Sequence, residues 1–261
     1  MEESFRKMTS TTQNRVILLK NKALKTLLPL IIILAVWEVA AWIINNSFIL
    51  PTVWETALAL FGIVTDLSFF AVLFTAFFRV LFGLAFGTLI GIILATLCHY
   101  FPIADTLISP VISIMKSTPV ACIIVLLWLS MNYTEIAIFV VLLMVMPIVW
   151  QNVLDGYHAI DKELYEVTRV FNFSFLKRVK VLVAPSLFNY LKPALITSIG
   201  LAWKAEIAAE IMTNSNIGAL IYRFRTVSYD TAAIFAWTVI IITFSIILEK
   251  TAKSLIRRLN K

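Results

Sequence analysis

The sequence predicts an all-α membrane protein, a polytopic bundle of about six transmembrane helices. Its composition is 61% hydrophobic and only 14% charged, and its mean hydropathy is +0.93. A chain of this composition cannot hide its apolar surface inside a water-soluble globule. With 261 residues, it is also too short for several large domains, so we expect one membrane domain.

Apolar segments long enough to cross a bilayer recur along the chain. We expect spans near 27–45, 71–98, 105–130, 134–153, 187–212 and 231–249. The third is the least regular, because Pro110, Lys116 and Pro119 interrupt it, and proline removes a backbone donor and kinks a helix. Its alternative is a short interfacial helix ending near Met115, followed by a shortened span from Val120 to Met131.

Residues 52–66, between the first two spans, are apolar on one face only. This pattern is typical of a helix lying at the membrane surface, here the outer one.

Lysine and arginine gather in the N-terminal tail, in the loop after the fourth span and at the C-terminus, whereas residues 46–70 contain neither. Cytoplasmic loops carry the excess of these residues, so both termini and the 154–186 loop are expected in the cytoplasm. The net charge of +7 then needs no nucleic acid to explain it. Since no small-residue cleavage site follows Trp42, the first span is interpreted as uncleaved. The expected organisation is a tail at 1–26, a transmembrane domain at 27–255 and a basic tail at 256–261.

The chain offers no pattern for a catalytic or metal site. Its seven glycines never form a GxxxxGK[ST] phosphate loop, and no base stands beside its scattered Ser and Thr residues. His99 and His158 are far apart in sequence, and Cys98 and Cys122 are expected to be buried free thiols. We therefore expect no enzyme activity and no cofactor bound by this chain.

Gly83, Gly87 and Gly91 stand four residues apart in the second span. Such a ladder of small residues lets another helix approach closely. Packing within the chain is favoured over a dimer interface.

The 154–186 loop predicts two short helices. Asp161 is placed to cap the first, with Glu163 in the first turn where the helix dipole favours a carboxylate. Leu164, Val167 and Phe171 then form an apolar stripe. Either a partner protein covers this stripe, or the helix lies on the membrane surface.

Asn172 is expected to end the first loop helix, because asparagine tolerates a left-handed backbone. Ser174 is placed to cap a second helix that continues through Val183. Pro185 is expected to stop that helix before the fifth span.

The spacing in this loop resembles a motif of ATP-binding-cassette (ABC) importer permeases. Glu166-Val167-Thr168 is followed by three residues, Asn172, nine residues and Leu-Val-Ala-Pro185. The family pattern is Glu-Ala-Ala, three residues, Gly, nine residues and Ile-x-Leu-Pro. Val-Thr replaces Ala-Ala here, Asn172 replaces Gly and Ala184 replaces Leu, but the length is unchanged.

Stretches on both sides of the loop resemble the nitrate, sulfonate and taurine branch of these permeases. Each is short, and their shared order carries the resemblance. They are Trp37-Glu38, Leu50-Pro51, Arg79-Val-Leu-x-Gly83, Pro147-Ile148, Gly200-Leu-Ala-Trp203, Ala209-Glu210 and Ile217-Gly218.

The resemblance implies the type I (Met-/Mal-like) importer fold in a bacterial inner membrane. It also implies a homodimer, two ABC ATPase subunits that hold ATP and Mg²⁺, an external solute-binding protein and a small polar solute. The residues implied in ATPase coupling are Asp161, Leu164, Glu166, Val167, Thr168, Phe171, Asn172 and Pro185. The alternative is an ion-coupled secondary transporter without an ATPase partner, although the two halves of the chain do not resemble each other.

Ionisable residues inside the expected spans form a second feature, since each costs about 2.5–3.5 kcal/mol on insertion scales. Glu206 and Glu210 share one helix face, where like charges repel, and Lys204 points elsewhere on an ideal helix. We therefore expect some compensation for these three charges from other helices, with Arg79 and Glu38 as the candidates. Two interpretations stand: an interhelical salt-bridge cluster that locks the fold, or a lining of the translocation pathway. The predicted pathway residues are Arg79, Trp203, Lys204, Glu206 and Glu210.

Overall fold

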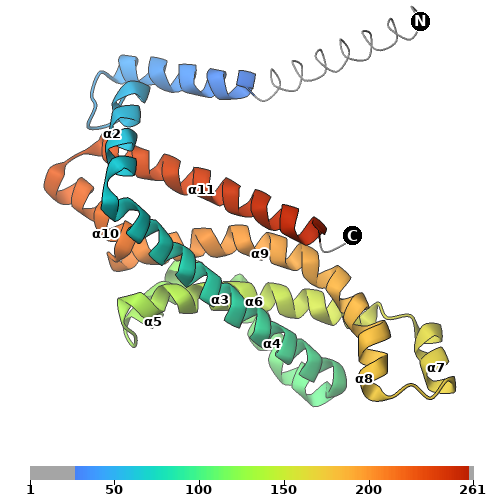
Figure 1. Cartoon of the computed structure of the whole chain (residues 1–261). Helices are drawn as coiled ribbons and strands as arrows, with labels where there is room; N and C mark the ends of the chain where they lie inside the picture. Colours follow the sequence, from blue (N-terminus) through green and yellow to red (C-terminus); the bar gives the residue numbers. More distant parts are fainter. Residues whose placement is uncertain (1–26, 259–261) are drawn as a thin grey trace, which may run out of the picture.

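A computed structural model describes residues 27–258, and every regular element in that range is a helix (Figure 1). The tails at 1–26 and 259–261, with the basic residues predicted to set the topology of the N-terminus, lie outside the described residues. The elements are an N-terminal helix (Leu27–Ile44), α2 (Val53–Thr65), α3 (Leu67–Tyr100), α4 (Pro102–Ser117), α5 (Val120–Trp128), α6 (Tyr133–His158), α7 (Lys162–Val170), α8 (Phe175–Arg178), the π-helix η1 (Val179–Val183), α9 (Ala184–Thr213), α10 (Asn216–Arg223), the π-helix η2 (Phe224–Ser228) and α11 (Thr231–Arg258).

The described chain contains five helices long and apolar enough to span a membrane, and a bent pair supplies the sixth. The five are the N-terminal helix, α3, α6, the rod Phe175–Thr213 and α11; counted with the bent pair they give the predicted six. The pair is α4 and α5, bent by 102°. Thr118 is extended (ψ 126°) because the ring of Pro119 disfavours a helical residue before it. The predicted alternative of a broken third segment is therefore confirmed.

Helices α3, α6 and α9 form the centre of the bundle, and α11 and α2 pack along it (Figure 1). The glycine ladder of α3 faces α6: a Cβ on Gly87 would lie 2.9 Å from the Leu142 carbonyl oxygen, and one on Gly91 would lie 2.9 Å from the Met146 carbonyl oxygen. Glycine is needed here because the α6 backbone occupies the space of a side chain. The ladder packs within the chain, as predicted.

The N-terminal helix is joined to α2 by side chains of the matched stretches. The Trp37 indole Nε1 donates to the Pro51 carbonyl at 2.9 Å, and the Glu38 carboxylate accepts from the Val53 backbone N–H at 2.8 Å. Thr52 and Glu55 form a capping box at the start of α2. Glu38 therefore does not compensate the charges of α9, so that part of the prediction is wrong.

Two further predictions are corrected. Pro185 does not stop a helix, because Phe175–Thr213 is one continuous rod. The Ala184 N–H bonds to the Val179 carbonyl in the wider π turn of η1, and Pro185 follows in the first turn of α9, where a missing donor is tolerated. Cys98 is buried as expected, but Cys122 is exposed on the described chain.

Candidate functional site

Helix α7 begins and ends at the capping residues that the sequence predicts. The Asp161 Oδ1 accepts from the Glu163 backbone N–H at 2.8 Å, which confirms the predicted cap. At the other end Asn172 has a φ of 53°. The Asn172 N–H bonds to the Arg169 carbonyl, and the Phe173 N–H bonds to the Thr168 carbonyl, both at 2.9 Å. This pattern is the Schellman motif, so α7 ends where the family pattern has glycine.

The apolar stripe of α7 has no cover within the described chain. Leu164, Val167 and Phe171 are 52%, 47% and 70% exposed. Figure 1 shows α7 projecting beside α8 at one end of the molecule, away from the central helices. Thr168, at the second small position of the motif, is buried, and its hydroxyl bonds to the Tyr165 carbonyl at 2.7 Å. The stripe is therefore available to a partner, whereas Thr168 lies on the buried side of α7.

The polar face of α7 borders a cavity of about 580 Å³ between the helix and the bundle. Glu166, one of the predicted coupling residues, lies on this face, and its carboxylate makes no hydrogen bond or ion pair with any residue of 27–258. Tyr165, on the same face, accepts from Arg178 Nη1 at 3.3 Å, which ties α7 to α8. The cavity is lined by His99, Tyr100, Tyr157, His158, Ile160, Lys162, Tyr165, Glu166, Arg169 and Val183.

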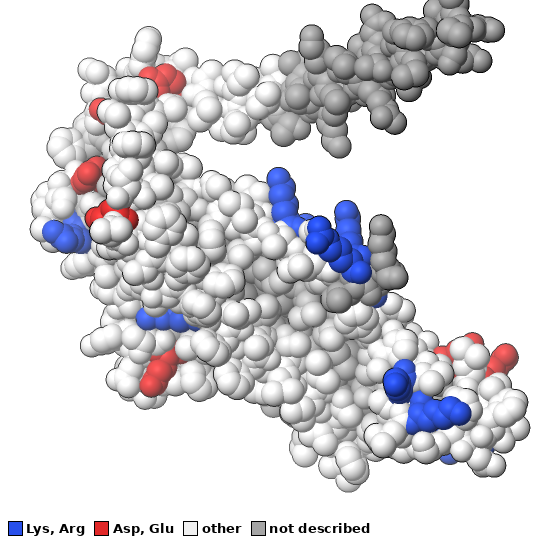
Figure 2. All heavy atoms as spheres, viewed as in Figure 1, with Lys and Arg blue, Asp and Glu red and all other residues white. Residues whose placement is uncertain are grey.

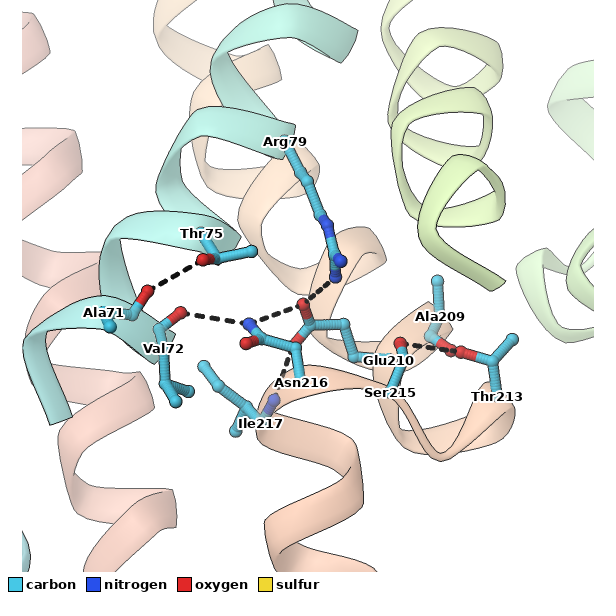
Figure 3. Close-up of polar contacts among 10 residues, drawn as sticks. All are labelled: Ala71, Val72, Thr75, Arg79, Ala209, Glu210, Thr213, Ser215, Asn216 and Ile217. Carbon is cyan, nitrogen blue, oxygen red and sulfur yellow. Dashed lines mark hydrogen bonds and ion pairs between the residues drawn. The ribbon is translucent and has the colours of Figure 1, made fainter. Parts of the chain in front are cut away.

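The structure brings Arg79 of α3 and Glu210 of α9 together inside the bundle (Figure 3). Arg79 Nη1 lies 2.7 Å from Glu210 Oε1. The Asn216 amide donates to the same oxygen at 2.8 Å and to the Val72 carbonyl at 3.0 Å. The Ile217 backbone N–H donates to Glu210 Oε2 at 3.0 Å. Both oxygens of this buried carboxylate are therefore satisfied, and three segments are held at one point.

The turn between α9 and α10 explains the spacing of the matched Ala-Glu and Ile-Gly pairs. Asn214 and Asn216 have φ values of 50° and 44°, so the chain turns back sharply after α9 and returns the Ile217 N–H to Glu210. A side chain on Gly218 would clash with the Glu210 backbone. The role of Asn216 was not predicted from the sequence. The pattern that could have indicated it is the pair Asn214 and Asn216 at the end of a helix, because asparagine tolerates a left-handed backbone.

The other predicted pathway residues lie on different sides of α9. Trp203 is buried, and its indole Nε1 donates to the Ile241 carbonyl at 3.1 Å. Glu206 is 0% exposed, and neither of its oxygens has a hydrogen-bond partner in the described chain. Lys204 is exposed. For Arg79 and Glu210 the geometry is that of an interhelical lock; a pathway role for any of the five remains a prediction.

Comparisons with known proteins agree with this architecture. Residues 87–261 match the model of the family described as binding-protein-dependent transport system inner membrane component. A protein of Bacillus subtilis (strain 168) named as an aliphatic sulfonates transport permease, SsuC, is 23% identical over 239 residues, which cover 90% of this chain and 86% of the relative.

The crystal structure of an amino acid ABC transporter with histidines shares the fold. It superimposes with a TM-score of 0.57 at 15% identity, over 72% of this chain and 89% of that chain. The helical architecture is thus the type I ABC importer transmembrane fold. The chain belongs to the family of binding-protein-dependent transport system inner membrane components, and it is the permease subunit of an ABC importer rather than an enzyme.

Proposed function

We propose that two copies of this chain form the pathway for a small polar solute that an external solute-binding protein delivers. Two separate ATPase subunits hold ATP and Mg²⁺ and drive the cycle, and α7 transmits their movement to the bundle. The complex lies in the bacterial inner membrane, with the termini and α7 on the cytoplasmic side.

The exposed stripe of α7 carries this proposal. Leu164, Val167 and Phe171 stand on one face of a short helix that is capped at both ends and projects from the bundle. An amphipathic helix of this kind docks its apolar face in a groove of a partner. Its rigid caps suit it to transmit displacement, because movement of the stripe moves the α7–α8 hairpin as a unit.

The charge distribution supports the proposed orientation. On the face drawn in Figure 2, Lys and Arg side chains gather over the C-terminal end of α11, several Asp and Glu side chains lie near α2, and the α7–α8 end shows charges of both signs. Lys250, Lys253, Arg257 and Arg258 cluster at the end of α11, and Lys177 and Arg178 lie in α8. An excess of these residues is typical of cytoplasmic segments.

The relative named for aliphatic sulfonates covers nearly the whole chain. Small organic sulfonates, which pair a compact charged group with a short apolar part, are therefore the first solutes to test.

Retention of ATPase subunits by the purified permease tests the coupling. The wild type is compared with Leu164→Asp, which puts a charge in the stripe. Val227→Asp is the matched control, because Val227 is also an exposed aliphatic residue but lies in η2, outside the loop. We expect a pair of ATPases on wild type and on Val227→Asp, and loss on Leu164→Asp. A folded wild type that retains none would favour an ion-coupled secondary transporter.

A further inference from the structure

Lys204 is an exposed cation on a membrane-spanning helix, and no described residue pairs with it. It lies on α9, within the rod Phe175–Thr213, and its ammonium group makes no hydrogen bond or ion pair with any residue of 27–258. The other cation discussed on the central helices, Arg79, is bound to Glu210. Lys116 of α4 donates to the Gln151 amide oxygen at 3.1 Å.

Lipid contact does not explain an unpaired lysine at this depth. Lys204 stands nine residues before the end of α9 at Thr213, which is about 14 Å at the rise of an α-helix. The lysine side chain reaches only about 6 Å, so its ammonium group cannot extend to the interface along this helix. A charge in the hydrocarbon core is unfavourable, and such residues face a bundle interior or a water-filled cavity.

The residues that share this face of α9 also differ from the exposed face of α3. At helical spacing from Lys204 the exposed positions are Pro193, Thr197, Leu201 and Ile211. By contrast, the outer face of α3 presents one phenylalanine after another, at Phe70, Phe74, Phe78, Phe82 and Phe86. Besides Lys204, these positions of α9 carry one polar residue, Thr197, and no aromatic residue.

The neighbouring element on one side of Lys204 is the broken helix pair. Ala205 and Ala209 pack against Ile123 and Ile124 of α5, which follows the 102° bend after α4. Backbone that leaves the helix at membrane depth is tolerated where protein covers it or where it lines a water-filled cavity. Broken helices of this kind occur around transport sites.

The acidic residues of α9 do not neutralise Lys204. Glu206 is buried on the opposite side of the helix, and Glu210 is bound to Arg79, Asn216 and Ile217.

We propose that Lys204 faces the translocation pathway and contacts an anionic group of the solute, so that the pathway selects anions. This inference rests on the proposed function, because the pathway forms between two copies of the chain.

Charge-selective labelling tests this proposal without knowledge of the solute. Leu201→Cys, three residues from Lys204 on an exposed position of α9, is made in a chain carrying Cys98→Ser and Cys122→Ser. The membrane-embedded complex is treated with 2-sulfonatoethyl methanethiosulfonate, an anion, or with its trimethylammonioethyl counterpart, a cation. The ratio of the two reaction rates is measured with Lys204 present, with Lys204→Arg and with Lys204→Met.

We expect both reagents to reach Leu201→Cys and the anion to be favoured. Replacement by methionine should lower the anion-to-cation ratio by about tenfold. The lysine charge attracts the anionic reagent and repels the cationic one, and at a separation of about 6 Å in water the two effects together amount to about this factor. Arginine should keep the ratio. Phe86→Cys, on the outer face of α3, is the control and should react with neither reagent.

Absence of labelling at Leu201→Cys, or a ratio that methionine leaves unchanged, would overturn the proposal. The second result would mean that a carboxylate of the other copy neutralises Lys204. ATPase retention is scored on the same samples. A complex that keeps its ATPases but shows no charge preference refutes the role of Lys204 alone, whereas loss of the ATPases from unmodified chains refutes the proposed coupling.

Discussion

The Arg79 guanidinium meets the Glu210 carboxylate 2.7 Å away, across 131 residues of sequence. Glu210 is fully buried, and its second oxygen is bound by the first turn of α10. This one carboxylate therefore fixes α3, the end of α9 and the start of α10 relative to each other (Figure 3).

Removing the cation from this pair should destabilise the bundle strongly. Arg79→Met leaves a buried carboxylate without its counter-charge, and breaking a buried pair in this way costs about 3–5 kcal/mol. The measurement is thermal unfolding of the permease in nanodiscs. Lys253→Met is the matched control, because Lys253 and Glu249 form an exposed pair at 3.6 Å, and such pairs contribute about 1 kcal/mol or less. Equal losses in the two variants would contradict the assigned lock.

The contact of α3 with α6 predicts intolerance of any side chain at Gly87. In Gly87→Ala the added carbon would lie 2.9 Å from the Leu142 carbonyl and 3.0 Å from Val145 Cβ, so the helices must separate, at a cost of about 1–3 kcal/mol. Gly62→Ala is the control: no atom lies within 4 Å of its added carbon, and alanine should stabilise α2 by up to about 1 kcal/mol. Unfolding midpoints of the two variants should move in opposite directions.

The left-handed turn after α7 predicts which residues Asn172 can be exchanged for. Its φ of 53° suits glycine, so Asn172→Gly should keep full ATPase retention. Asn172→Val should weaken the α7 cap by about 1–2 kcal/mol, because a β-branched residue is strained there. Retention of the ATPase subunits and protease resistance of the loop both report the change. A valine variant that behaves like the glycine variant would show that the turn geometry does not matter for coupling.

The capping box of α2 predicts that the stability of the fold depends on pH. The Thr52 backbone N–H, helped by the Ser47 hydroxyl, holds the pKa of Glu55 below its ordinary value near 4.5. A carboxyl whose pKa is lowered on folding stabilises the fold above its ordinary pKa, and loses that contribution as the pH falls through the folded pKa. The difference in unfolding temperature between wild type and Glu55→Gln should therefore shrink between about pH 7 and about pH 3. A constant difference would assign Glu55 no such role.

Local signals in the sequence predicted much of this structure. The caps Asp161 and Ser174, the left-handed Asn172 and the glycine ladder depend on a few neighbouring residues or on helical spacing, and all are found as expected. Pro185 was misjudged because its effect depends on a π turn just before it, which a residue pattern does not reveal.

The placement of the charges was predictable only in part. Arg79 was expected to compensate the acids of α9, but the choice of Glu210 over Glu206 depends on where α10 folds back. Glu38 was the other candidate partner for the charged residues of α9, but its carboxylate accepts the Val53 backbone N–H at the start of α2 instead. These outcomes are decided by tertiary packing, which a single sequence does not specify.

The mass of the intact complex, isolated from membranes with the ATPase and measured by native mass spectrometry, tests the central claim most directly. We predict two copies of the 29.5 kDa chain with two ATPase subunits, and separation of the ATPases when Leu164→Asp is introduced. A stable permease that carries no ATPase, or a complex unaffected by that substitution, would contradict the role assigned to α7.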